Sequence, residues 1–263
     1  MASQPEYDLV ELFWSAQGEG PHVGRSTIFL RFGGCDLRCS WCDSPETWVP
    51  RRDCRIESSP GSGHFEREPN PVSHHRLAQG LAGLAPRVGS FLSLTGGEPL
   101  LQPAAVLGAA GIAREMGLRV FLETHGLAVA AMGEVVGSVD YVSMDWKLDS
   151  EVRWADTASL ETRPLSFADG HVNFLELLVR EKVEACVKVV VTCETTAREL
   201  EQVCSAIVAT APSAPLILQP VTPFGRVRDS PSAERLLEHL RVCEEKVDDV
   251  RLIPQTHRVY GAL

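Results

Sequence analysis

The sequence has no dense run of lysine and arginine and no long apolar run. Its 263 residues include 25 Lys and Arg against 35 Asp and Glu, so the formal net charge is −10. A nucleic-acid partner is not expected, because binding its backbone needs clustered cations that replace counterions. No stretch reaches the roughly 18–20 apolar residues that span a bilayer, and the first residues are acidic rather than apolar. These absences predict a cytoplasmic protein that binds neither nucleic acid nor membrane.

A fourth cysteine is missing from the one place where cysteines gather. Cys35, Cys39 and Cys42 have the spacing C-x3-C-x2-C, and the next cysteine, Cys54, comes twelve residues later. Thiolates are the usual ligands of iron–sulfur clusters, whereas a structural zinc site normally takes four ligands. Three thiolates on a four-iron cluster leave one iron open to a substrate or cofactor. Zinc held with Cys54 or with a histidine such as His22 is the alternative.

Strand-like and helix-like segments alternate along the chain. Strands are predicted at residues 27–32, 90–94, 118–122, 141–144, 187–192, 216–218 and 251–253, and helices at 103–116, 172–182, 196–210 and 232–246. This order predicts an α/β fold with a parallel sheet and right-handed crossovers. Six or so βα units favour a partial (β/α)6 barrel. We expect one domain, residues 1–263, with residues 50–73 as a mobile surface insertion rich in Pro, Gly, Ser, Arg and Glu.

Polar motifs come directly after several of these strands. They occupy residues 33–43, 95–99, 123–126, 145–147, 219–220 and 254–257. The carboxyl ends of parallel strands lie on one side of the fold, where ligand chemistry gathers. The motifs therefore predict one shared site.

Two of the motifs resemble signatures of the radical S-adenosyl-L-methionine (SAM) superfamily. One is the cysteine spacing with an aromatic residue, Trp41, directly before the last cysteine, and the other is TGGEP at residues 95–99. The resemblance implies a modified radical SAM barrel with a 4Fe–4S cluster on Cys35, Cys39 and Cys42. It further implies that SAM chelates the open iron, and that electron transfer then yields a 5′-deoxyadenosyl radical.

A second block of motifs resembles the 7-carboxy-7-deazaguanine synthase family. It comprises QGEG at residues 17–20, FLRF at 29–32, CDS at 42–44 and PQTH at 254–257. The resemblance implies a carbon–nitrogen lyase of queuosine and deazapurine biosynthesis that acts on 6-carboxy-5,6,7,8-tetrahydropterin. Hydrogen leaves C6, the ring contracts and ammonia departs, with Mg²⁺ as an additional cofactor. A homodimer and an electron donor such as flavodoxin or ferredoxin are also implied.

The same resemblance implies roles for individual residues. The substrate set is Ala16, Gln17, Gly18, Glu19, Arg31, Thr95 and His257. The SAM set is Trp41, Cys42, Asp43, Gly97, Glu98, Ser143, Lys147 and Lys188. Arg31 offers a planar fork that suits the substrate carboxylate. Ser44 stands where the family usually has a threonine ligand to Mg²⁺, and it keeps the hydroxyl. No side chain is expected to be catalytic, because SAM and the cluster carry the chemistry.

Two other functions stay open on the sequence. A radical SAM activating enzyme would generate a glycyl radical on a partner protein, and it would need an exposed groove for a polypeptide. A zinc-stabilised binding module would instead need a fourth ligand beside the three cysteines.

Overall fold

A curved sheet, ten-stranded within the described residues, lies at the centre of the fold. The computed structural model describes residues 5–85, 90–159, 163–259, 261 and 262. Within them the strand order is β14-β13-β12-β10-β9-β8-β3-β2-β5-β6. The strands are β2 Leu9–Ala16, β3 Ser26–Phe32, β5 Asp53–Glu57, β6 Phe65–Pro69, β8 Phe91–Gly96, β9 Arg119–Thr124, β10 Tyr141–Asp145, β12 Glu184–Val191, β13 Leu216–Pro220 and β14 Val250–Leu252. Because the order has two ends, the sheet is a partial barrel.

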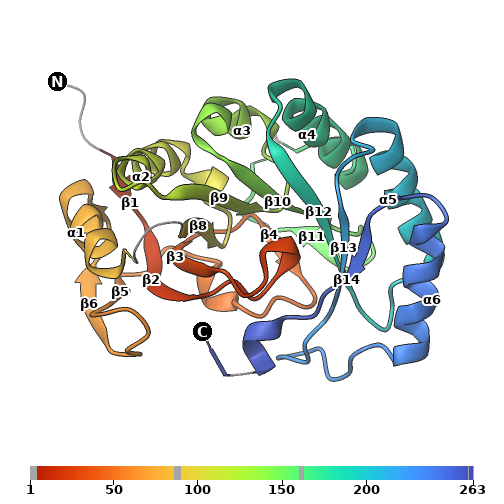
Figure 1. The fold of residues 1–263 in the computed structure, drawn as a ribbon, viewed down its shortest axis with the longest axis horizontal. Helices are drawn as coiled ribbons and strands as arrows, with labels where there is room; N and C mark the ends of the chain where they lie inside the picture. The colour runs from red at the N-terminus through yellow and green to blue at the C-terminus, as the bar shows by residue number, and fades with distance from the viewer. Residues whose placement is uncertain (1–4, 86–89, 160–162, 260, 263) are drawn as a thin grey trace.

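In the described part of the chain, six α-helices cover the outer face of this sheet. They are α1 His74–Leu84, α2 Pro103–Glu115, α3 Val129–Val135, α4 Phe167–Glu181, α5 Ala197–Thr210 and α6 Ala233–Glu244. Figure 1 shows them as an arc that runs from α1 beside the inserted strands to α6 beside β14. Two small sheets pair β1 Glu6–Tyr7 with β7 Val72–Ser73, and β4 Leu37–Cys39 with β11 Val152–Trp154.

The predicted parallel fold is confirmed. Neighbouring strands from β3 through β8, β9, β10, β12 and β13 to β14 all pair in parallel. Each predicted strand and helix overlaps an observed one. The sequence pattern did not predict β2, α1 or the short α3, because these elements lie outside the regular alternation of strands and helices.

Residues 50–73, which the sequence predicts to be a mobile surface insertion, contain regular strands. Strands β5 and β6 form an antiparallel hairpin, and β5 pairs in parallel with β2. Cys54 and Ile56 point into the core, whereas Arg55 between them is exposed. Charged residues on an edge strand discourage pairing with other chains, and they also give the segment a loop-like composition. The insertion therefore extends the sheet.

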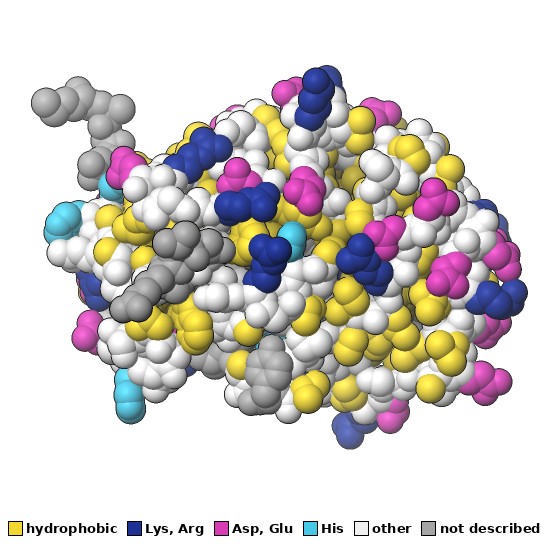
Figure 2. Space-filling model, viewed as in Figure 1, with side chains coloured by type: hydrophobic (Ala, Val, Ile, Leu, Met, Phe, Trp, Pro, Cys, Tyr) yellow, Lys and Arg dark blue, Asp and Glu magenta, His cyan; other side chains and the backbone are white. Residues whose placement is uncertain are grey.

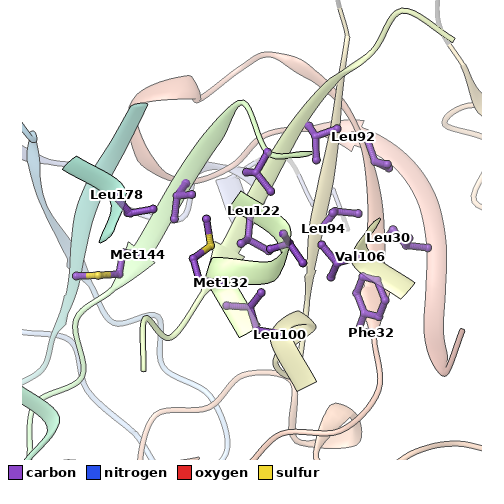
Figure 3. Packing of buried hydrophobic residues seen from close by; sticks show 14 of the residues in the cluster. Leu30, Phe32, Leu92, Leu94, Leu100, Val106, Leu122, Met132, Met144 and Leu178 are labelled. Carbon is purple, nitrogen blue, oxygen red and sulfur yellow. The ribbon is translucent and has the colours of Figure 1, made fainter. Parts of the chain in front are cut away.

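The core lies between the sheet and the arc of helices. Leu92 and Leu94 of β8, Leu122 of β9 and Met144 of β10 point towards the helices and are fully buried. Figure 3 shows these side chains packed with Val106 of α2, Met132 of α3 and Leu178 of α4. Successive strand residues point to opposite faces, so the residues between them point into the barrel.

Interior side chains change character along the strands. At the amino ends they form an apolar layer of Phe91, Phe121, Tyr141, Cys186 and Ile217. Further along the same faces come Glu123, Asp145 and Lys188, which line a cavity. The apolar layer closes one end of the barrel, and polar groups gather at the other.

The outer surface carries much of the negative charge. Figure 2 shows acidic side chains gathered over α5 and α6. In the part of the chain that the structure describes, no helix is both long and apolar enough to cross a membrane.

Asn70 fastens the end of the insertion to the sheet. Its Nδ2 donates to the carbonyls of Leu9 at 2.6 Å and Arg51 at 3.1 Å, and its Oδ1 accepts from the Leu9 amide at 3.1 Å. We predict that Asn70→Ala lowers the free energy of unfolding by about 1–3 kcal/mol, because backbone groups lose their partners. Chemical denaturation measures this loss. Asn173→Ala, on the exposed face of α4, is the control and should change stability little. Equal stability of the two variants would contradict the prediction.

Candidate active site

A polar cavity of about 400 Å³ opens at the carboxyl ends of the parallel strands. Its walls come from the segment after β2, the cysteine loop, the ends of β8, β9, β10, β12 and β13, and the C-terminal segment. This is the edge at which the polar motifs were predicted to meet. Most of the residues that line it carry charged or hydrogen-bonding groups.

The cysteine loop is held at both ends by backbone hydrogen bonds. The amides of Gly34 and Cys35 donate to the carbonyls of Thr47 and Trp48, at 2.7 and 3.3 Å. Strand β4 then pairs with β11, and the Ser40 amide donates to the Glu151 carbonyl at 2.9 Å. Hydrogen bonds within the loop and to β11 therefore define its shape.

The three thiols of this loop fit an iron–sulfur cluster. Cys35, Cys39 and Cys42 are half-buried, and Cys35 and Cys39 line the cavity. Burial raises the pKa of Cys35 to about 12 and that of Cys39 to about 11. The free thiols therefore keep their protons at neutral pH, and metal binding would release them. A donor set of three sulfurs beside a cavity suits a cluster with one open iron.

Neither proposed fourth zinc ligand lies beside the thiols. Cys54 is fully buried in the main hydrophobic core. His22 contacts the apolar layer at the opposite end of the barrel, with its ring centroid 4.5 Å from that of Tyr141 and 5.3 Å from that of Phe91. The zinc site that the sequence left open therefore has neither of the fourth ligands considered for it.

Gly97 of the TGGEP turn packs directly on the cysteine loop. A Cβ on Gly97 would lie 2.1 Å from the carbonyl oxygen of Gly34, so a larger residue would push the two segments apart. Beside this contact, His125 Nε2 lies 3.0 Å from Asp36 Oδ1. These two contacts fix the cysteine loop against β8 and β9.

The carboxylate of Glu98 is used within the protein. It is fully buried and accepts hydrogen bonds from the Leu100 amide at 2.9 Å, Thr124 Oγ1 at 2.8 Å and the His125 amide at 2.9 Å. Its side chain does not line the cavity. It shapes the turn that places Gly97 at the cavity wall.

Lysines and carboxylates alternate across the floor of the cavity. Lys188 pairs with Glu19 and lies 3.0 Å from Asp145, and Lys147 lies 2.9 Å from Asp145 on its other side. Burial alone would raise the pKa of Asp145, but the two lysines hold it below its ordinary value. Buried charges are tolerated where they are paired in this way. The floor is therefore a fixed array of charges ready to orient a polar ligand.

Glu123 is the exception, because it lacks a direct ion pair within the described residues. It accepts hydrogen bonds from Ser93 Oγ at 2.7 Å and Gln17 Nε2 at 3.0 Å. Burial raises its pKa, and the lysine nearby, Lys188, lowers it only in part. This carboxyl group can be protonated more easily than an exposed one, so it can donate as well as accept.

The motifs at the two ends of the chain touch each other. The Thr256 amide donates to the Gly18 carbonyl at 2.9 Å, and Gln255 Nε2 donates to Glu19 at 2.8 Å. A Cβ on Gly18 would lie 2.0 Å from His257 Nδ1, so only glycine leaves room for that ring. QGEG and PQTH therefore build one wall together, although more than two hundred residues separate them.

Most of the predicted site residues line this cavity. All seven residues of the substrate set do so, as do Trp41, Asp43, Gly97, Lys147 and Lys188 of the SAM set, and Ser44. Cys42, Glu98 and Ser143 do not; the Ser143 hydroxyl instead lies 3.7 Å from Cys186 Sγ inside the barrel.

Several lining residues were absent from the predicted sets. Among them are Glu11, Arg55, Glu123, Asp145 and Gln255. Glu123, Asp145 and Gln255 belong to polar motifs that follow strands, so their position gave a signal. Glu11 and Arg55 belong to strands that the sequence reasoning did not identify.

Cys35, Cys39 and Cys42, called the thiol triad below, lead to a prediction that distinguishes an iron–sulfur cluster from a zinc site. Anaerobic reconstitution should give about four iron and four sulfide per chain and a broad brown absorbance. Cys39→Ala should lose most of the iron, because one of three ligands is gone. Cys54→Ala is the matched control and should keep the iron, since Cys54 lies in the core. Loss of metal from Cys54→Ala, or zinc in place of iron, would contradict the three-thiol site.

Comparisons with known proteins agree with this geometry. A family model described as the radical SAM superfamily matches residues 30–207. The 7-carboxy-7-deazaguanine synthase of Geobacter sulfurreducens is 38% identical and covers 99% of this chain and 100% of that protein. The 7-carboxy-7-deazaguanine synthase of Thermococcus kodakarensis is 33% identical, covering 97% and 98%.

A solved structure shows the same fold. QueE from Escherichia coli superposes with a TM-score of 0.59 at 19% identity, covering 96% of this chain and 95% of that one. The sequence relatives span almost the whole chain, and the superfamily match includes the three cysteines and the TGGEP turn. The chain therefore belongs to the 7-carboxy-7-deazaguanine synthase family of radical SAM enzymes, which use a 4Fe–4S cluster and SAM.

Proposed function

We propose that the cavity contracts the ring of 6-carboxy-5,6,7,8-tetrahydropterin to give 7-carboxy-7-deazaguanine, with loss of ammonia. One observation carries the proposal: Cys35 and Cys39 of the cysteine loop, the two lysines Lys147 and Lys188, and Arg31 all line one cavity of about 400 Å³. That volume suits a small ligand beside SAM better than a polypeptide. Membership of the family favours the same reaction over generation of a glycyl radical on a partner protein.

The residues present fit the two cofactors of the family. Cys35, Cys39 and Cys42 would hold the cluster, and the close approach of Gly97 would leave the backbone accessible to SAM. When bound, the cluster and SAM supply the radical that removes hydrogen from the substrate. Around them the protein excludes water and keeps its own charges balanced.

The opposite wall supplies groups for an anionic pterin. Arg31 is held through its Nε by Glu11 at 2.9 Å, and within the described residues no group occupies its two Nη atoms. These atoms can grip a carboxylate. Burial lowers the pKa of His257, so its ring is neutral at pH 7 and offers one donor and one acceptor. Gln17 and Glu19 complement the ring N–H and carbonyl groups.

Mg²⁺ would be held through Ser44. Its hydroxyl lines the cavity and lies 3.2 Å from Asp43 Oδ1. Two oxygens at this spacing suit a hard cation, which would complete its shell with substrate oxygens and water. The cation would fix the substrate carboxylate near the thiol triad.

The setting of the enzyme is part of the same proposal. We propose that residues 1–263 act as a single domain, since the two terminal motifs build one wall of the cavity. All eight cysteines are unpaired, which supports a reducing cytoplasm. A flavodoxin or ferredoxin would deliver electrons, a homodimer would form, and nucleic acid and membrane would play no part.

Product formation tests the reaction. We predict that reconstituted protein, incubated anaerobically with SAM, reductant, Mg²⁺ and the carboxy-tetrahydropterin, releases 7-carboxy-7-deazaguanine detectable by mass spectrometry. Arg31→Gln should lower kcat/KM about a hundredfold, because a charge-assisted hydrogen bond to the substrate carboxylate is lost. Arg180→Gln, on the exposed side of α4, should match the wild type. Absence of product from the wild type would end the specific assignment.

Titration with Mg²⁺ tests Ser44. We predict that Ser44→Ala raises the Mg²⁺ concentration for half-maximal activity about tenfold or more, since an oxygen ligand is removed. Ser44→Thr keeps the hydroxyl and should stay within about twofold of the wild type. If Ser44→Ala responds to Mg²⁺ as the wild type does, Ser44 is not a ligand.

A further inference from the structure

Three charged residues stand opposite one another on three neighbouring strands. Glu11 of β2 faces Arg31 of β3 on one side and Arg55 of β5 on the other in the strand register. All three side chains line the cavity. Directly opposed residues on adjacent strands are the closest side-chain neighbours in a sheet. We call these three residues the charge ladder.

Glu11 is shared between the two arginines. Its Oε1 accepts from Arg31 Nε at 2.9 Å, and its Oε2 accepts from Arg55 Nη2. Its side chain is only 8% exposed, so water screens it little. The ladder carries one negative and two positive charges, hence one net positive charge at the cavity wall.

Without Arg55 the ladder would lose its net positive charge. Glu11 would then neutralise Arg31 as an isolated pair, and the wall would present no net charge to an anion. From these contacts we propose that Arg55, in the inserted hairpin, is a positioning residue that makes the cavity selective for a carboxylated substrate. It does so by sharing the Glu11 carboxylate with Arg31, so that Glu11 does not cancel the whole charge of Arg31. The inference rests on the proposed function, because it assigns the substrate carboxylate to Arg31.

The hairpin keeps the charge of Arg55 available for this purpose. Its guanidinium lies over the Phe65 ring, 4.8 Å from the centroid. The two carboxylates of β5 have other partners. Asp53 pairs with Arg67 at 2.8 Å, and Glu57 accepts from the backbone amides of Trp14 and Gly63 at 2.9 Å. Glu11 is therefore the carboxylate that Arg55 engages.

The other carboxylates near Arg31 have cationic neighbours of their own. Glu123 and Asp43 both act on Arg31 through space. Glu123 lies in the field of Lys188, and Asp43 lies 3.3 Å from Arg258. Within the described residues, Glu11 is the carboxylate that hydrogen-bonds directly to Arg31.

Removal of charges from the ladder tests the proposal. The variants are Arg55→Gln, Arg55→Lys and the double variant Arg55→Gln/Glu11→Gln, with Arg67→Gln on the same hairpin as control. Binding of 6-carboxypterin and of pterin without the carboxylate is followed by pterin fluorescence, and kcat and KM are measured for the carboxy-tetrahydropterin. Thermal unfolding and iron content verify that each variant folds.

We expect Arg55→Gln to raise KM and the Kd for 6-carboxypterin about tenfold, with kcat within about threefold. Loss of a fully buried charge so close to the substrate carboxylate would change KM and Kd by more than tenfold. The Arg55 side chain, however, is 48% exposed, so solvent partly screens its charge. Binding of plain pterin should not change. The double variant should regain affinity for 6-carboxypterin, because the neutral amide that replaces the Glu11 carboxylate still accepts from Arg31 Nε without cancelling its charge. Arg55→Lys should retain most of the affinity.

Three results would overturn the inference. They are an unchanged KM in Arg55→Gln, an equal loss of affinity for both pterins, and failure of the double variant to regain affinity. The second would mean that the hairpin supports the fold alone. If the wild type binds 6-carboxypterin selectively and the variants behave as expected but no 7-carboxy-7-deazaguanine forms, the proposed reaction fails and the ladder stands. If product forms while Arg55→Gln matches the wild type, the ladder alone fails.

Discussion

Alternation of side chains along the parallel strands is the constraint on which the site depends. One set of residues packs against the helices, and the other set fills the barrel. On the inner face of β9, Phe121 is followed two residues later by Glu123, and on β10 Tyr141 is followed four residues later by Asp145. An aromatic layer thus closes one end, and charges collect at the other. Because buried charges need partners, the charged side chains at the carboxyl ends of the strands form ion pairs around the cavity.

Contacts between distant segments give that cavity its remaining walls. Gly97 approaches the cysteine loop so closely that a Cβ would collide with it, and Gly18 makes room for His257 in the same way. The missing side chain at Gly97 leaves room for the cysteine loop, and the missing side chain at Gly18 leaves room for the His257 ring. The cysteine loop and the C-terminal segment therefore depend on β8 and β2 for their placement, and a change at either glycine should disturb ligands that it does not itself touch.

The inserted hairpin belongs to the site as well as to the sheet. It buries Cys54 and Ile56 against the core, and between them it presents Arg55 to the cavity. A carboxylate shared by two arginines leaves one of them with capacity for an incoming anion. The β5–β6 hairpin follows the cysteine loop in the chain and reaches the opposite wall of the cavity. The same strand that widens the sheet therefore also adds a positive charge, that of Arg55, to the site.

The sequence by itself determined most of the parallel strands and their helices, the three clustered cysteines and the family resemblance, because periodicity and the spacing of Cys35 to Cys42 are local properties. It also placed the polar motifs at the carboxyl ends of the strands, so most lining residues could be predicted. Only the tertiary structure decided that Glu98 turns inward, that QGEG meets PQTH, and that the insertion at residues 50–73 contains a hairpin that extends the sheet. Only strand register brought Glu11 between Arg31 and Arg55. These outcomes depend on which distant segments pair and in what alignment, and no local pattern encodes that choice.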